Sequence, residues 1–209
     1  VTATDPDGTA QNLSFTLSAG ADMARFAIDA STGVLSFLTA PDYETPLDAN
    51  GDNSYEVVVQ VADGTGAVDV QTIAITVTSV NDNTPAITSS ATASVAENTT
   101  AVLTVTASDA DQPAETLSYS LVGGGDAALF AIDASTGALS FKLAPNFEAP
   151  ADAGVDNVYD VTVQVSDGTF SSNQAIAISV TAVNDNTPAI ASSATASVAE
   201  NTTAVLTVT

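Results

Sequence analysis

The sequence predicts an all-β protein made of tandem seven-stranded Greek-key β-sandwiches. Three observations support this fold class: sequence blocks recur about every hundred residues, apolar and polar residues alternate within the blocks, and turn-forming residues separate the alternating runs. No segment shows the roughly 3.6-residue periodicity of an amphipathic helix.

The blocks repeat with a period typical of a domain. "FAIDASTGVLSF" at Phe26 returns as "FAIDASTGALSF" at Phe130, 104 residues later, and "SVAENTTAVLTVT" occurs at Ser94 and again at Ser197. With "NDNTP" as the boundary, residues 84–186 form one complete repeat, which we call the second repeat. Residues 1–83 form a first repeat without its opening strand, and residues 187–209, the C-terminal segment, open a third. We therefore expect the chain to belong to a longer array.

The expected strands of the second repeat follow one another between turn signals. They cover residues 86–95, 101–107, 117–121, 129–132, 138–141, 158–167 and 175–183. Alternation places Tyr159, Val161 and Val163 on the inward face of one strand, and Ile176 and Ile178 on the inward face of another. Seven short strands in about a hundred residues are typical of an immunoglobulin-like sandwich.

The stretch "IDASTG" predicts a tight hairpin turn. Asp133 can accept hydrogen bonds from the backbone amides that follow it, and Gly137 suits a position with positive φ. The same turn is expected from Asp29 to Gly33.

The charge balance restricts the partners. The chain has 25 acidic and 2 basic residues, for a net charge of −23, yet 45% of its residues are hydrophobic, which is enough to form a core. Nothing in it could neutralise nucleic-acid phosphates or dock on anionic lipid. No apolar run is long enough to span a membrane, so we expect no membrane insertion.

The residue types present also restrict the chemistry. The chain has no Cys and no His, which excludes disulfides and thiolate metal sites and removes the commonest general base. Metal ligands must therefore be oxygens from Asp, Glu, Asn or the backbone, and oxygen-only ligation favours calcium or magnesium. No activated nucleophile is apparent, and we expect no enzymatic activity.

Six motifs occur in order: "AEN", "DAD", "FAIDASTG", "NFE", "VSDG" and "VNDNTP". This series resembles a cadherin repeat, and most of all the cadherin-like repeats of large bacterial surface proteins. The resemblance implies extracellular sandwiches joined end to end at the cell surface, with calcium bound at each junction by the base of one domain, the linker and the top of the next.

The resemblance also assigns ligands to each junction. At the first junction the base, the linker and the top supply Asp42, Glu44, Asn81, Asp82, Asn83, Asp109, Asp111 and Asp167. At the second junction the ligands are Glu97, Glu148, Asn184, Asp185 and Asn186. The upper half of a preceding junction is assigned to Asp5, Asp7 and Asp63, and the base of the third repeat to Glu200.

Departures from the family pattern limit the number of ions. Ser79 and Ala182 stand where the family linker has Asp, and Asn146 stands where the first repeat has Asp42. We expect fewer than three ions at each junction and two at the first. The loop from Pro46 to Ser54, with carboxylates at alternate positions, is either a separate metal site or an exposed acidic loop.

These features favour a calcium-rigidified structural repeat of a long extracellular adhesin or surface fibre. Its partners would be neighbouring repeats of the same chain or copies of itself. One alternative is a calcium-dependent carbohydrate-binding module with a polysaccharide partner. Another is a strand-exchanging filament subunit, in which residues 189–209 complete the first repeat of another copy.

Overall fold

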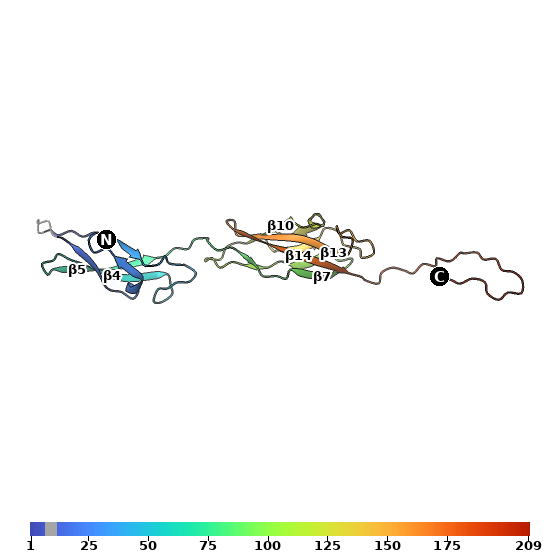
Figure 1. Cartoon of the computed structure of the whole chain (residues 1–209), viewed down its shortest axis with the longest axis horizontal. Coiled ribbons are helices and arrows are strands. Elements are labelled where there is room, and N and C mark those ends of the chain that lie inside the picture. Colours follow the sequence, from blue (N-terminus) through green and yellow to red (C-terminus); the bar gives the residue numbers. More distant parts are fainter. Residues whose placement is uncertain (7–11) are drawn as a thin grey trace.

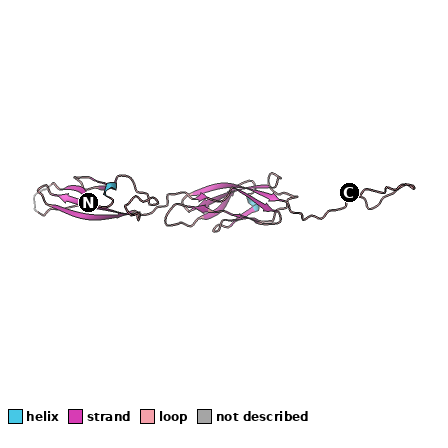
Figure 2. Ribbon diagram, turned by 90° about the horizontal axis from the view of Figure 1, so that it is seen from below, coloured by secondary structure: helices cyan, strands magenta, loops and turns pink. Residues whose placement is uncertain are grey.

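The computed structural model describes residues 1–6 and 12–209. Two strand-rich units follow one another along the chain, and the C-terminal segment extends away from the second (Figure 1). The only helical elements among the described residues are two 3₁₀ turns, η1 (Met23–Arg25) and η2 (Ala127–Leu129), so the fold is all-β as predicted (Figure 2).

The second repeat is a sandwich whose main sheet has the strand order β10-β13-β14-β7. A second sheet has the order β11-β12-β8, and β6 and β9 form a separate two-stranded pair. The strands are β6 (Ala86–Ile87), β7 (Thr92–Ala96), β8 (Ala101–Thr104), β9 (Ala107–Ser108), β10 (Ser118–Gly123), β11 (Phe130–Ile132), β12 (Ala138–Phe141), β13 (Val158–Ser166) and β14 (Ser171–Thr181).

Two of the expected strands are each divided between different sheets. Residues 86–95 form β6, which pairs with β9, and then β7, which pairs in parallel with β14. Residues 101–107 likewise break into β8 and the start of β9. Each of these two runs therefore changes its partner strand midway.

The core consists of the side chains that the alternation places inward. Val161 is 1% exposed, and Val163, Ile176 and Ile178 are 0% exposed. Tyr159 packs edge-on against the Phe130–Phe141 pair, and its hydroxyl oxygen accepts a hydrogen bond from Ala151 N at 3.2 Å. The period-two prediction is confirmed for these strands.

The first repeat has fewer strands. Its two sheets have the orders β1-β4-β5 and β2-β3, with no counterpart of β7 or β8 among the described residues. The strands are β1 (Ser14–Ala19), β2 (Phe26–Ile28), β3 (Leu35–Phe37), β4 (Ser54–Ala62) and β5 (Val68–Thr76). Ile73 and Ile75, the equivalents of the fully buried Ile176 and Ile178, are therefore only partly buried.

The C-terminal segment contains no regular strand. Its one backbone–backbone hydrogen bond runs from Ala191 N to Thr209 O, at 2.8 Å. Within the part of the chain that the structure describes, no helix has the length and apolar character needed to cross a membrane.

Candidate metal centre

Carboxylates from separate parts of the chain gather at both junctions. Three groups of three have ligand atoms within 4.8 Å of one another. At the first junction, Glu44, Asp82 and Asp111 form what we call the linker cluster, and Asp109, Asp111 and Asp167 form the upper cluster. At the second, Glu97, Glu148 and Asp185 form the second-junction cluster.

The linker cluster joins the two repeats. Glu44 follows β3 in the first repeat, Asp82 lies between β5 and β6, and Asp111 follows β9 in the second repeat. Gln112 N donates to Glu44 Oε1 at 3.2 Å, which is a direct hydrogen bond across the junction. The base, the linker and the top thus each contribute one carboxylate.

Asp111 belongs to both first-junction clusters and is only 2% exposed. Its carboxylate accepts hydrogen bonds from Asn83 Nδ2 at 2.8 Å and from Asn83 N at 3.2 Å. The Asn83 side chain holds the pKa of Asp111 below its usual value, and backbone amides of the linker contribute to the shift. Asp111 is therefore kept ionised, as a cation ligand must be.

Buried side-chain oxygens at the first junction lack hydrogen-bond partners, two of them in the upper cluster and one on the linker. Asp109 Oδ2, Asp167 Oδ2 and Asn81 Oδ1 have no hydrogen bond to any described residue. The other Asp167 oxygen accepts from Thr169 N at 2.6 Å and Phe170 N at 2.7 Å. A buried acceptor left without a donor is costly, and a hard cation held by the upper cluster would satisfy the oxygens of Asp109 and Asp167. The residues present therefore fit calcium.

Glu115 is a functional candidate that the sequence did not reveal. Asn81 Nδ2 donates to Glu115 Oε2. Burial raises the pKa of Glu115 above its usual value, and the negative charges of the upper cluster raise it further. The residue aligned with it in the first repeat is Gln11, so no repeated acidic motif pointed to this position.

Asp42 was predicted as a ligand but lies outside all three clusters. Its Oδ1 accepts from Glu44 N at 2.9 Å and from Thr45 N at 3.1 Å, so it closes the turn that presents Glu44. Asn146 makes the equivalent two bonds, at 2.9 Å and 3.2 Å, before Glu148. An amide oxygen suffices for this role, which explains why Asn can occupy the position.

The second junction is built around a buried glutamate. Glu97 is 1% exposed and accepts from Phe147 N at 2.8 Å and Val183 N at 2.7 Å. The Phe147 amide, followed by that of Val183, holds the pKa of Glu97 below its usual value. Asn98 Nδ2 donates to Asp185 Oδ2 at 2.7 Å.

The two linker asparagines of the second junction flank Asp185. Asn186 Nδ2 donates to Asp185 Oδ1 at 3.0 Å, as Asn83 Nδ2 does to Asp82 Oδ1 at 3.1 Å. Asn184 and Asn186 are both exposed. The two linkers therefore share one local arrangement.

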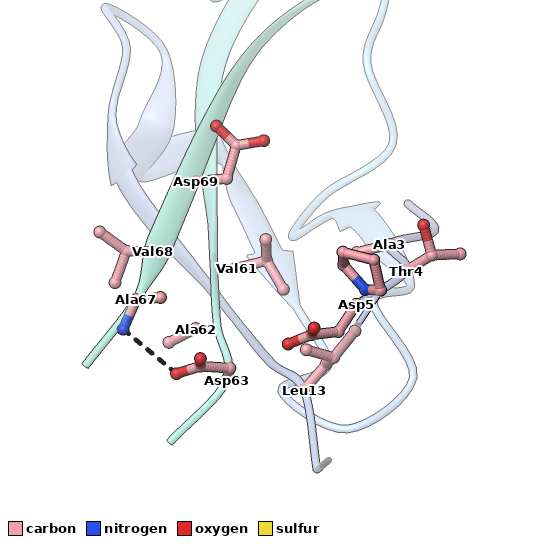
Figure 3. Close-up of a pocket in the computed structure, with 11 residues that line it drawn as sticks. Ala3, Thr4, Asp5, Leu13, Val61, Ala62, Asp63, Ala67, Val68 and Asp69 are labelled. Carbon is pink, nitrogen blue, oxygen red and sulfur yellow. Dashed lines mark hydrogen bonds between the residues drawn. The ribbon is translucent and has the colours of Figure 1, made fainter. Parts of the chain in front are cut away.

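At the upper end of the first repeat, Asp5 and Asp63 line a shallow pocket of about 260 Å³ together with Asp69 (Figure 3). Asp63 Oδ1 accepts from Ala67 N at 3.2 Å. No group of three ligands forms there among the described residues, and Asp7 lies outside them. Glu200 is exposed in the C-terminal segment and joins no described cluster.

In the loop from Pro46 to Ser54, and in the equivalent loop of the second repeat, the first aspartate accepts hydrogen bonds from backbone amides. Asp48 is 8% exposed and accepts from Asp52 N at 2.9 Å and Asn53 N at 3.2 Å. Asp152 accepts from Asp156 N at 2.9 Å and Asn157 N at 3.1 Å. Burial acts to raise the pKa of each carboxyl, but these amides outweigh it and hold the pKa below its usual value. Of the two hypotheses for this loop, the structure supports an acidic loop organised by its own backbone.

The fold and the junction carboxylates together define a tandem β-sandwich protein with clusters of carboxylates between its units. The sequence matches the Cadherin domain family over residues 1–78 and 91–199, and the chain belongs to this family. Cadherin domains are in general extracellular, calcium-dependent adhesion repeats without enzymatic activity.

Similar proteins and structures agree with this assignment. The chain is 30% identical over 186 residues to human Protocadherin Fat 1 and 32% identical over 201 residues to rat Protocadherin-16. It spans 4% and 6% of their lengths, while 84% and 90% of the chain is covered. The crystal structure of human Protocadherin-24 EC1-2 superposes with a TM-score of 0.68 at 22% identity, covering 87% of this chain and 86% of that one.

Proposed function

We propose that this chain is a calcium-rigidified structural segment of a long extracellular adhesin or surface fibre, with domain boundaries after residues 83 and 186. The observation that carries the proposal is the linker cluster, in which Glu44, Asp82 and Asp111 come from one repeat, the linker and the next repeat. The resemblance to cadherin-like repeats of large bacterial surface proteins supports placing the parent protein on a bacterial surface.

Neighbouring residues position the junction carboxylates before any ion binds. Asn83 and backbone amides keep Asp111 ionised and fixed, and Asp42 fixes the turn that presents Glu44. Bound calcium would neutralise carboxylates that otherwise repel one another across the junction. The two repeats would then be held in one relative orientation.

The expected affinity suits an extracellular setting. Extracellular modules bind calcium at roughly 10⁻⁴–10⁻³ M. At a tenfold excess over the dissociation constant, each independent site adds about 1.4 kcal/mol to the stability of the folded form. Several such sites would add a large fraction of the total stability of a small domain.

A carbohydrate-binding role has weaker support. Sugar-binding platforms use exposed aromatic rings, but the chain has no Trp. Its buried aromatics, which include Phe15, Phe26, Tyr55 and Phe130, belong to the two cores. Phe170 is the only large aromatic among the exposed hydrophobic residues of the described chain.

Thermal unfolding tests the proposal. We expect millimolar calcium, but not millimolar magnesium, to raise the Tm by roughly 5 °C or more relative to chelator, because several ions bind only the folded form. The Asp111→Asn variant should lose the part of this rise that comes from the first junction, since Asp111 serves both first-junction clusters. Asp160→Asn, an exposed change on β13, is the matched control and should keep the full rise. An equal calcium response in Asp111→Asn and the unmodified chain would overturn the proposal.

A further inference from the structure

The two repeats carry the same small pocket on their surfaces. The first pocket, of about 210 Å³, is lined by residues of η1, β3, β4 and the loop between β3 and β4. The second pocket, of about 370 Å³, is lined by residues of η2, β12, β13 and the corresponding loop. All nine residues that line the first pocket align with residues that line the second. The pocket is therefore a feature of the repeat itself.

Each pocket is complete within one repeat. No described residue of the second repeat lines the first pocket, although the second repeat follows directly in the chain. The second pocket has no lining residue from β7 or β8, the strands without a described counterpart in the first repeat. None of the clustered junction carboxylates lines either pocket. The pockets are thus separate from the candidate metal centre.

The only two basic residues of the chain line these two pockets. Arg25 lines the first and Lys142 lines the second. They do not occupy aligned positions, because Arg25 aligns with Leu129 and Lys142 aligns with Leu38. The two positions are neighbours in each repeat, since Leu38 N donates to Arg25 O and Lys142 N donates to Leu129 O, both at 2.9 Å. Each pocket therefore has one cation and one leucine on the same pair of positions, in opposite order.

Both cations lack an acidic partner. The Arg25 side chain makes no hydrogen bond or ion pair with any described residue. Lys142 Nζ donates to Ala128 O at 2.8 Å and forms no ion pair within the described chain. The chain has 25 acidic residues, so these two cations are left available for an external anion even though internal carboxylates are abundant.

A buried tyrosine hydroxyl supplies each pocket with a second donor. Tyr55 is 2% exposed and lines the first pocket, and Tyr159 is 1% exposed and lines the second. Their hydroxyl oxygens accept hydrogen bonds from Leu47 N at 3.1 Å and from Ala151 N at 3.2 Å. Neither hydroxyl proton has an acceptor in the part of the chain that the structure describes. Since a buried donor without an acceptor is costly, a ligand oxygen in the pocket would stabilise it.

We propose that each pocket binds a small monoanion with a short apolar body, such as a short-chain carboxylate. The carboxylate would pair with Arg25 in the first pocket or with Lys142 in the second. It would also accept the free hydrogen bond of Tyr55 or Tyr159. The apolar body would lie against the aromatic and aliphatic side chains that form most of the lining.

The size and charge of the pockets restrict the ligand. Their volumes of about 210 and 370 Å³ lie near or below the lower end of the range for small-molecule sites, so the body must be short. An exposed leucine lines each pocket, Leu38 in the first and Leu143 in the second, which favours an apolar body. The net charge of −23 repels anions, and one cation per pocket compensates for a single negative charge.

Titration with hexanoate, followed by amide NMR signals, tests each pocket separately. The Leu47 and Ala151 amides donate to the two tyrosine hydroxyl oxygens, so they report on the first and the second pocket. We expect hexanoate to shift both signals in a saturable manner in calcium-free buffer. Hexanol has the same chain length without the charge, and it should bind about tenfold more weakly because it cannot pair with the cation.

Exchanging the cation between its two positions provides matched variants. Lys142→Leu removes the cation of the second pocket and introduces the residue that the first pocket has there. The Ala151 signal should then need about tenfold more hexanoate, while the Leu47 signal of the same molecule should respond as before. Adding Leu129→Arg to Lys142→Leu reproduces the arrangement of the first pocket and should restore the Ala151 response. Such a rescue would exclude a loss of folding as the cause.

Four results would overturn the proposal. The absence of a saturable shift at both amides would leave the pockets filled by water alone. Equal binding of hexanol and hexanoate would show that the pockets do not select an anion. An unchanged Ala151 response in Lys142→Leu, or no rescue by Leu129→Arg, would show that the cation does not hold the ligand. None of these results bears on calcium binding at the junctions.

Discussion

At the scale of single residues, many of the acidic side chains serve the backbone rather than a metal. Asp133 Oδ1 accepts from Ser135 N at 3.0 Å and from Thr136 N at 2.8 Å, and Gly137 has a φ of 71°. Both features of the predicted hairpin turn are confirmed. The Thr136 amide and the Ser135 hydroxyl are the main causes that lower the pKa of Asp133 to about 2.

This shift predicts a pH-dependent effect for Asp133→Asn. Asparagine keeps the acceptor oxygen but removes the charge that strengthens the turn's hydrogen bonds, so at pH 7 the Tm of the second repeat should fall by roughly 5 °C. Because the folded pKa is lowered, the carboxylate's contribution is present above pH 3.8 and is lost as the pH falls towards 2. The difference in Tm between the variant and the unmodified chain should therefore shrink over that range.

Calorimetry in chelator between pH 7 and pH 2 measures this difference without a contribution from calcium. Asp160→Asn is again the control, because its carboxylate is exposed and accepts no hydrogen bond within the described chain. If the difference in Tm between Asp133→Asn and the unmodified chain does not change with pH, the substitution acts by disturbing packing and not by removing the charge.

At the scale of elements, the sequence predicts which residues form strands better than it predicts their partners. Alternation identifies β13 and β14 and their inward faces, because burial on one face of a sheet imposes a period of two. It does not predict that β7 runs parallel to β14, because the alternation within a strand is the same whichever direction the neighbouring strand takes. The break between β6 and β7 was missed for the same reason.

The missing strands of the first repeat predict unequal costs for one substitution at equivalent sites. Ile178→Ala should destabilise the second repeat by about 2–5 kcal/mol, because it leaves a cavity in a closed core. Ile75→Ala should cost about 1–2 kcal/mol in the first repeat, because Ile75 is only partly buried.

Urea unfolding followed by NMR signals from each repeat separates the two effects. Equal costs at the two positions would mean that Ile75 is packed as fully as Ile178, contrary to its partial burial in this structure.

At the scale of the whole molecule, the resemblance to a cadherin repeat predicted where carboxylates from different domains meet. The clusters contain Glu44, Asp82, Asp109, Asp111 and Asp167, all predicted from motifs in register. Calcium ligation by these residues stays a prediction. Glu115 could not be found in this way, because its position depends on the fold of one loop and no motif recurs there. The turn-closing role of Asp42 was not foreseen, because the sequence does not distinguish it from ligation; ligation by Asp42 also stays a prediction.

The last prediction concerns the flexibility of the junction. Without a cation, the linker cluster brings like charges from both repeats together, so the hinge should sample many orientations in chelator. Calcium should hold the two repeats in one orientation, which small-angle X-ray scattering would detect as a narrower pair-distance distribution with a defined maximum length. Glu44→Gln should abolish the calcium effect on shape, because Glu44 is the carboxylate that the sandwich of the first repeat, as distinct from the linker that carries Asp82, contributes to the cluster.

The chain itself supplies the control for that experiment. Asp42→Asn removes a charge two residues from Glu44 but keeps the turn-closing oxygen, as Asn146 shows at the equivalent position. It should respond to calcium as the unmodified chain does. Scattering curves extrapolated to zero concentration exclude any contribution from association between copies. If Asp42→Asn loses the response as fully as Glu44→Gln, Asp42 is either a ligand itself, as the resemblance implies, or acts through the net charge around the junction. If only Glu44→Gln loses it, the junction is rigidified by a coordinated ion.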